Sequence, residues 1–147
     1  MIPKAVIQNV LDRIDPEMVI DLTARLVRCN SVWDPQAGTS EAEAAELAAG
    51  WAREKGFDVA VETVAPDRPN VIIRWAAGPG PQTLMFEGHT DVVTPGNLSR
   101  WQYDPFGAQI EKGRMFGRGG KDTKAEIEMM KQDAAAFQQQ LDDAQGD

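Results

Sequence analysis

The spacing of apolar side chains divides the chain into helical and extended segments. Met18, Leu22 and Leu26 recur every four residues, which is the spacing of one face of a helix. Residues 57–64 instead alternate apolar and polar side chains, which is typical of a strand with one buried face. The whole pattern predicts helices over 2–14, 16–29, 40–55 and 122–141, and strands over 57–64, 70–75 and 83–86.

Local signals predict where two of these helices begin and end. Pro16 stands in the first turn of the second helix, where its missing N–H is not needed. Ser40, followed three residues later by Glu43, predicts a capping box at the start of the third helix. Gly56 is the residue type that closes a helix in the left-handed conformation.

The order of the elements indicates the fold class. The apolar run 83–86 has no strongly polar position, so we expect a strand that is buried on both faces. If this strand continues to Val93, its period of two places His89, Asp91 and Val93 on one face. Helices come first, then consecutive strands, then a helix, which predicts an α/β fold. The chain of 147 residues is long enough for one domain, and we find no internal repeat or linker.

The composition excludes several classes of function. The net charge of −8 comes from 23 acidic and 15 basic residues, which is unsuited to nucleic-acid binding. No run approaches the ~20 apolar residues of a membrane span, and the first residues do not resemble a signal peptide. We therefore expect a cytoplasmic protein that binds neither nucleic acid nor a membrane. Cys29, the only cysteine, has apolar neighbours, so we expect a buried structural thiol rather than a nucleophile.

Candidate metal chemistry begins at the only histidine. His89 and Asp91 are spaced so that both side chains point the same way from an extended backbone. Imidazole and carboxylate groups are ligands for Zn²⁺ and for other divalent ions. Asp91 could bind a metal itself, or it could accept the other ring N–H of His89, and the extended geometry favours the second role. The pair alone also fits a surface hydrogen bond, so the two residues leave both interpretations open.

A second carboxylate follows a glycine-rich turn. The turn 117–120 leads into Asp122, and its glycines allow the backbone to approach an ion closely. A carboxylate in this position has two oxygens and can bridge two metals. The same glycines do not indicate nucleotide binding. Asp122 stands where a Walker loop requires Ser or Thr, and no G-x-G-x-x-G spacing is present.

Four blocks of sequence follow one another in order: Gly88-His89-Thr90-Asp91-Val92-Val93, Trp101 with Asp104-Pro105-Phe106, residues 113–119, and Asp122-x-Lys124. Together these blocks resemble the M20 metallopeptidase family, which includes acetylornithine deacetylase, succinyl-diaminopimelate desuccinylase, aminoacylase-1 and the glutamate carboxypeptidases. Weaker similarity extends back to about Pro16.

The resemblance implies a role for each matched site residue. His89 is expected to bind one zinc, Asp91 to be the catalytic-site carboxylate that orients His89, and Asp122 to bridge two zincs. Co²⁺ or Mn²⁺ could replace Zn²⁺ in such a site. The implied reaction is hydrolysis of an amide bond in a small N-acyl amino acid or peptide. The implied fold is a partial zinc-exopeptidase-like α/β arrangement, in which a three-layer sheet is flanked by helices.

The sequence also departs from the family pattern. The general-base Glu and the later metal ligands of the family lie downstream of the matched region, and one histidine cannot supply the two imidazoles of a binuclear site. Ala125 and Glu126 stand where the family usually has small residues, and the lid or dimerisation domain is not matched. We therefore expect residues 1–147 to be a truncated N-terminal part of a catalytic domain that is inactive by itself. The alternative is a non-catalytic binding or regulatory module, which would self-associate or bind a complementing C-terminal segment.

Overall fold

A computed structural model describes residues 4–76, 78, 83–120 and 124. The site residue Asp122 and the helix predicted over 122–141 lie outside these residues, apart from Lys124. Among the described residues, no helix is long and apolar enough to cross a membrane. The elements are α1 (Lys4–Leu11), α2 (Pro16–Arg28), α3 (Ala42–Glu54), β1 (Asp58–Ala65), β2 (Arg68–Arg74), the 3-10 helix η1 (Leu98–Arg100), β3 (Gln109–Glu111) and β4 (Arg114–Phe116).

Helix α2 begins where the sequence predicts. The Asp15 carboxylate accepts hydrogen bonds from the backbone N–H groups of Glu17 at 3.0 Å and Met18 at 3.4 Å. These bonds satisfy donors that the first turn of a helix leaves without a partner, and Pro16 occupies the position that needs none. The helix ends at Arg28, one residue before the predicted boundary.

The start of α3 differs from the predicted capping box. The helix begins at Ala42, and Glu41 at its N-cap position makes no side-chain capping bond. Ser40 Oγ accepts a bond from the Ala42 N–H at 3.2 Å. The Glu41 carboxylate is turned toward Arg68 instead of toward its own helix. At the other end, Gly56 has a φ of +83° just beyond the C-cap, so the predicted stop is confirmed.

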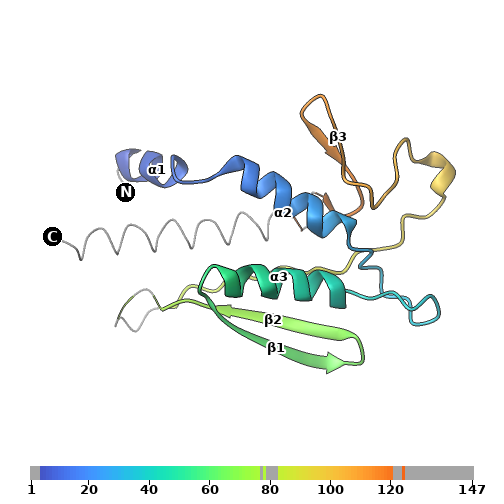
Figure 1. Cartoon of the computed structure of the whole chain (residues 1–147), viewed down its shortest axis with the longest axis horizontal. Helices are drawn as coiled ribbons and strands as arrows, with labels where there is room; N and C mark the ends of the chain where they lie inside the picture. Colours follow the sequence, from blue (N-terminus) through green and yellow to red (C-terminus); the bar gives the residue numbers. More distant parts are fainter. Residues whose placement is uncertain (1–3, 77, 79–82, 121–123, 125–147) are drawn as a thin grey trace.

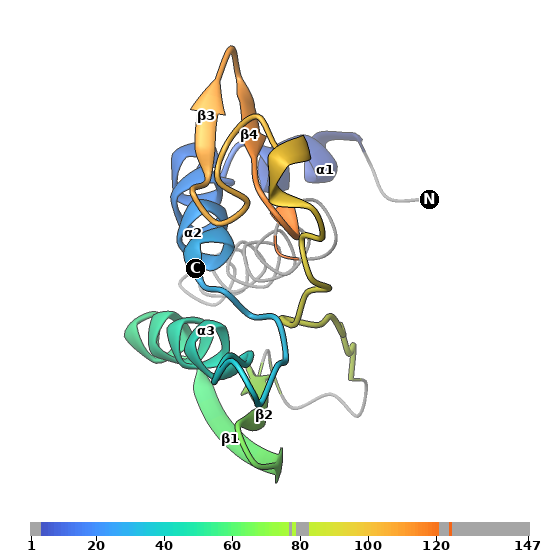
Figure 2. The ribbon, with the colours of Figure 1, turned by 90° about the vertical axis from the view of Figure 1, so that its right-hand side faces the viewer.

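The core forms on two sides of α2, which lies between the other layers of the molecule (Figures 1 and 2). On one side, Leu22 packs with Trp51 and Ala52 of α3, close to the β1–β2 hairpin. On the other side, Val27 packs against Ala108, next to the β3–β4 hairpin. The face of α3 that is buried is made mainly of alanines, which allow helix and hairpin to approach closely: Ala44, Ala45, Ala48, Ala49 and Ala52.

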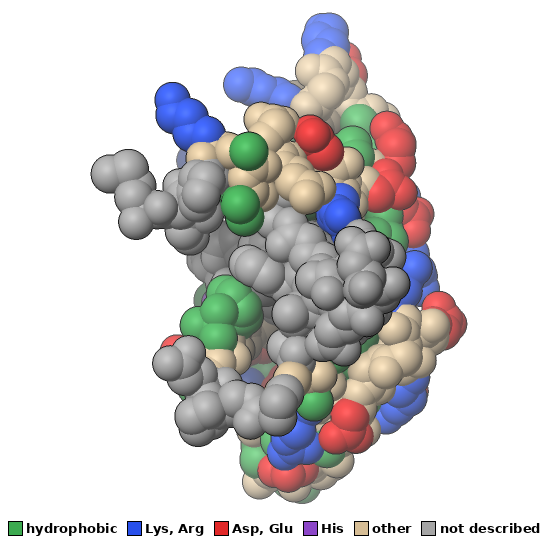
Figure 3. Space-filling view, turned by 90° about the vertical axis from the view of Figure 1, so that its left-hand side faces the viewer, with side chains coloured by type: hydrophobic (Ala, Val, Ile, Leu, Met, Phe, Trp, Pro, Cys, Tyr) green, Lys and Arg blue, Asp and Glu red, His purple; other side chains and the backbone are tan. Residues whose placement is uncertain are grey.

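Helix α1 forms, but three of its apolar side chains remain exposed. Val6, Ile7 and Leu11 are all exposed. On the face of the molecule at the α1 end, hydrophobic side chains reach the surface among charged ones (Figure 3). The predicted amphipathic pattern therefore indicates the helix correctly but does not indicate where it packs.

The prediction of a doubly buried strand over 83–86 is wrong. Residues 83–91 contain no strand, and the side chains of Leu84 and Met85 are 77% and 78% exposed. The segment 83–86 is exposed because no described strand pairs with it. Strand β2 pairs with β1 in an antiparallel register, with Val59 opposite Ile73, and no described strand covers the 83–86 segment.

The α/β class is confirmed at this level of detail. The described residues form helices together with two separate two-stranded sheets, β1–β2 and β3–β4. The finer expectation, a three-layer sheet of the zinc-exopeptidase kind, stays a prediction of the resemblance.

Candidate metal centre

The carboxyl end of α2 brings the motif-bearing segments together. The Val92 N–H donates a hydrogen bond to the Ser31 carbonyl at 3.1 Å, and Val32 and Val92 form a parallel bridge. Gly117 lies against the same end of the helix, where a Cβ atom would collide with Val27 Cγ1. The block that contains His89 and the glycine-rich turn are therefore held at the end of α2 and by the residues that directly follow it.

Lys124 fixes the last motif block to the same place. Its side chain is fully buried, and its Nζ donates hydrogen bonds to the carbonyl of Leu26 at 2.7 Å and the carbonyl of Cys29 at 3.2 Å. A positive charge at the carboxyl end of a helix is favourable, although burial of the amine lowers the pKa of Lys124 to about 8. Sequence reasoning placed Lys124 in a motif but gave it no role.

Cys29 is the buried thiol that the sequence predicts. Its Sγ lies 3.4 Å from the Arg25 carbonyl, and burial raises the pKa of the thiol. Because the thiolate is the reactive form, both properties favour a structural role.

His89 and Asp91 are in direct contact. His89 Nδ1 lies 3.1 Å from Asp91 Oδ1 and 3.0 Å from the Asp91 backbone oxygen. Both side chains are partly exposed, at 53% for His89 and 41% for Asp91. An ionised carboxylate and a carbonyl can only accept hydrogen bonds, so neutral His89 donates from Nδ1 and carries its lone pair on Nε2. A metal ligated by His89 would therefore be bound through Nε2.

Arg68 holds Asp91, and Glu41 holds Arg68. The sequence pattern indicated neither residue. Arg68 Nη2 lies 3.3 Å from Asp91 Oδ2, while Arg68 Nε lies 2.6 Å from Glu41 Oε1. Glu41 is buried, and its hydrogen bond is the main reason why the pKa of Arg68 is raised. The Arg68 guanidinium also lies over the Trp33 ring, 5.5 Å from its centroid. Glu41 and Arg68 are 27 residues apart, and no local spacing in the sequence connects them.

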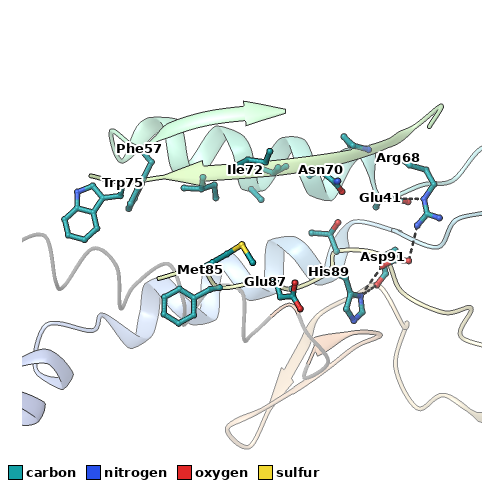
Figure 4. Close-up of a pocket in the computed structure, with 18 residues that line it drawn as sticks. Glu41, Phe57, Arg68, Asn70, Ile72, Trp75, Met85, Glu87, His89 and Asp91 are labelled. Carbon is teal, nitrogen blue, oxygen red and sulfur yellow. Dashed lines mark hydrogen bonds and ion pairs between the residues drawn. The ribbon is translucent and has the colours of Figure 1, made fainter. Parts of the chain in front are cut away.

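The pair opens onto a cavity between β2 and the extended segment 85–91 (Figure 4). The cavity volume is ≈ 740 Å³. One end is lined by apolar and aromatic side chains, and the other end by the row Glu41, Arg68, Asp91 and His89. A mostly apolar cavity with a few polar groups at one end is the usual form of a small-molecule site.

The described residues fit one ligand position of a zinc site. His89 supplies an imidazole, and Asp91 supplies the carboxylate that orients it, which is the usual arrangement for a metal-bound histidine. Within the described part of the chain, however, no group of three or more His, Cys, Asp or Glu side chains could hold an ion.

Comparison with known proteins gives the class. Residues 85–147 match the sequence profile of peptidase family M20/M25/M40. The match includes the His89–Asp91 pair, the glycine-rich turn and the Asp122-x-Lys124 block. It confirms the resemblance drawn from the motif blocks, and the chain carries a partial domain of the M20 family.

Several similar proteins are succinyl-diaminopimelate desuccinylases. The one from Methylocella silvestris is 40% identical over 122 residues, which cover 80% of this chain and 30% of that protein. The one from Beijerinckia indica is 35% identical over 130 residues, which cover 88% of this chain and 33% of that protein. The one from Methylobacterium nodulans is 41% identical over 118 residues, which cover 79% of this chain and 28% of that protein. The chain thus spans about a third of the length of these relatives.

Proposed function

We propose that this chain contributes to the metal-dependent hydrolysis of an amide bond in a small N-acyl amino acid or peptide. The observation that carries the proposal is the His89–Asp91 contact, which lies inside the matched M20 region and at the polar end of a cavity. The names of the desuccinylase relatives make an N-succinyl amino acid the first substrate class to test.

The chain's own residues have distinct proposed roles. His89 would hold a zinc through Nε2, while Asp91 keeps Nδ1 protonated and the ring in one orientation. Asp122 is proposed as the carboxylate that bridges two metals. A bound Zn²⁺, Co²⁺ or Mn²⁺ supplies Lewis-acid polarisation of a carbonyl and a water of lowered pKa.

We propose further that the 147-residue polypeptide hydrolyses little by itself. Catalytic zinc usually has three protein ligands, and the one histidine of this sequence cannot supply the second imidazole of a binuclear site. The remaining ligands and the general base would therefore have to come from residues outside 1–147.

A non-catalytic binding module is the competing proposal. The exposed apolar side chains of Leu84, Met85 and Phe86 favour it, because exposed apolar surface often marks an interaction site. Size-exclusion chromatography separates the two proposals. A monodisperse monomer that binds no hydrophobic dye would contradict the binding module.

Zinc titration by calorimetry is the direct test of the metal proposal. We expect the wild-type chain to bind Zn²⁺, and His89→Ala and Asp122→Ala to abolish binding. Asp58→Ala removes an exposed carboxylate on β1 and should leave binding unchanged, so it is the matched control. Equal binding by wild type and His89→Ala would contradict the proposed ligand.

Hydrolysis is tested with an N-succinyl amino acid. We expect turnover only when the chain is mixed with the C-terminal two-thirds of a desuccinylase relative and a divalent metal. Turnover that persists after chelation would contradict the metal dependence.

A further inference from the structure

We infer that Arg68 is a positioning residue, which fixes the Asp91 carboxylate so that Asp91 holds the His89 imidazole in the Nδ1-protonated form. The inference deepens the proposed function and rests on it, since the orientation of His89 matters only if this residue binds a metal.

The guanidinium acts as a two-sided clamp. Its Nη2 contacts Asp91 Oδ2 at 3.3 Å, and its Nε contacts Glu41 Oε1 at 2.6 Å. Asp91 Oδ2 is therefore bonded to Arg68 while Oδ1 of the same carboxylate faces His89 Nδ1 at 3.1 Å. With both oxygens engaged, rotation of the carboxylate about its Cβ–Cγ bond would break at least one charge-assisted contact.

Arg68 is itself held in place on the side away from Asp91. Glu41 is 6% exposed and belongs to the first residues of the α3 region, so its carboxylate is anchored by the core. Trp33 covers the guanidinium at 5.5 Å from the ring centroid, which restricts the side chain further. A long arginine side chain that is fixed on two sides loses little additional freedom when it binds Asp91.

The chain of contacts from Arg68 to Asp91 to His89 indicates how Arg68 acts on the imidazole. Arg68 contacts the Asp91 carboxylate, and the Asp91 carboxylate contacts the imidazole, so we infer that Arg68 acts on His89 through the carboxylate (Figure 4). Arg74 lies on the same strand and pairs with Asp58 at 4.0 Å, outside this row. Arg74 has the same charge as Arg68 and lies on the same strand, so it provides a matched control.

The test reads the tautomer of His89 directly. The chain has one histidine, so the imidazole nitrogens give one set of signals in a ¹⁵N spectrum, recorded where the ring is neutral. In the wild type we expect the Nδ1–H form to dominate. Arg68→Met should lower the ratio of Nδ1–H to Nε2–H about threefold to tenfold, because one charge-assisted contact no longer orders the carboxylate. Arg74→Met should leave the ratio unchanged.

Conservative variants distinguish positioning from a purely structural role. Arg68→Lys keeps the charge, but one ammonium group cannot reproduce the planar fork, so we expect an intermediate ratio. Glu41→Gln keeps an oxygen acceptor for Arg68 and should shift the ratio in the same direction by less. If Arg68→Met fails to fold by circular dichroism, Arg68→Lys decides the question.

An unchanged ratio in the folded Arg68 variants would overturn the inference and leave the proposed function standing. Absence of metal-dependent turnover when the chain is mixed with the complementing C-terminal segment would remove the proposed function, while the tautomer ratio could still respond to Arg68. Where zinc binds, Arg68→Met should weaken it about tenfold, which is the usual scale for an outer partner of a metal-bound histidine.

Discussion

The Nζ atom of Lys124 lies 2.7 Å from the carbonyl oxygen of Leu26, across 98 residues of sequence. This contact attaches Lys124 to the end of α2, close to the residues that hold Val92 of the His89 block. It is a buried contact, so the charge of the amine has a predictable effect on stability.

The stability contributed by Lys124 should depend on pH. The pKa of this amine is about 8 in the folded chain and near 10.5 in the unfolded chain, so between these values the unfolded chain binds more protons. The free energy of unfolding of the wild type, relative to Lys124→Met, should therefore rise from about pH 8 to about pH 10.5. Urea unfolding of both proteins across this range provides the measurement.

The Cys29 thiol opposes this trend, because burial raises its pKa and favours the unfolded thiolate at high pH. Both proteins carry Cys29, so its own burial largely cancels in the difference between them. The charge of Lys124 also lowers the pKa of this thiol, and this coupling raises the difference in the same direction as the lysine itself. A difference that falls with pH would contradict the prediction.

Gly117 should tolerate no side chain. A Cβ atom there would collide with Val27 and lie 3.2 Å from the Pro105 carbonyl oxygen. Gly117→Ala should destabilise the fold by about 1–3 kcal/mol, as overpacking of a core does. Gly50→Ala is the matched control, because it lies within α3 and has open space around its Cα. It should instead stabilise by about 0.5–1 kcal/mol, and equal effects in denaturant unfolding would refute the packing argument.

Cys29 should react slowly with iodoacetamide in the folded chain. The thiol is 3% exposed, and burial raises its pKa, so both access and the thiolate fraction are reduced. Mass spectrometry after timed labelling gives the rate, with the chain in denaturant as the reference. Labelling at the same rate in both conditions would show that the end of α2 is open.

Asp15 should contribute to the stability of α2 through its capping bonds to Glu17 and Met18. Asp15→Ala should lower the free energy of unfolding by about 1 kcal/mol, whereas Asp15→Asn should retain most of it. Asp21→Ala removes a carboxylate from the middle of the same helix, where its contact with Arg25 is long and exposed at 3.9 Å. This control should change stability by less than about 0.5 kcal/mol.

Local patterns predicted the parts of the fold that depend on local forces. The start of α2 at Pro16 and the stop at Gly56 follow from backbone hydrogen bonds and φ preferences within a few residues. The alternation over 57–64 likewise indicated β1, but only Val59 of this strand packs on the core with α3, while Val61 and Val64 are exposed. The segment 83–86 was mispredicted because its burial depends on a partner strand, which its own sequence does not specify.

The candidate site also combines a contact that local sequence predicts with contacts that depend on distant elements. The spacing of His89 and Asp91 predicted their contact, since two residues of extended backbone suffice to make it. The clamp of Arg68 and Glu41 joins the start of β2 to the start of α3, and it exists only after these elements pack. The predicted capping box does not form, since Glu41 occupies the N-cap position and Ser40 Oγ accepts its bond from the Ala42 N–H.

The last turn of α2 has a consequence for how the chain opens. Val27 and the carbonyl of Leu26 in this turn, and Ser31 just beyond the helix end, each contact a segment that is distant in sequence. We expect opening of this turn together with the residues that follow it to release all three segments. Such segments form one cooperative unit and should share a common opening free energy in native-state hydrogen exchange. A substitution in α2 that never approaches His89 could then disassemble the site as a whole.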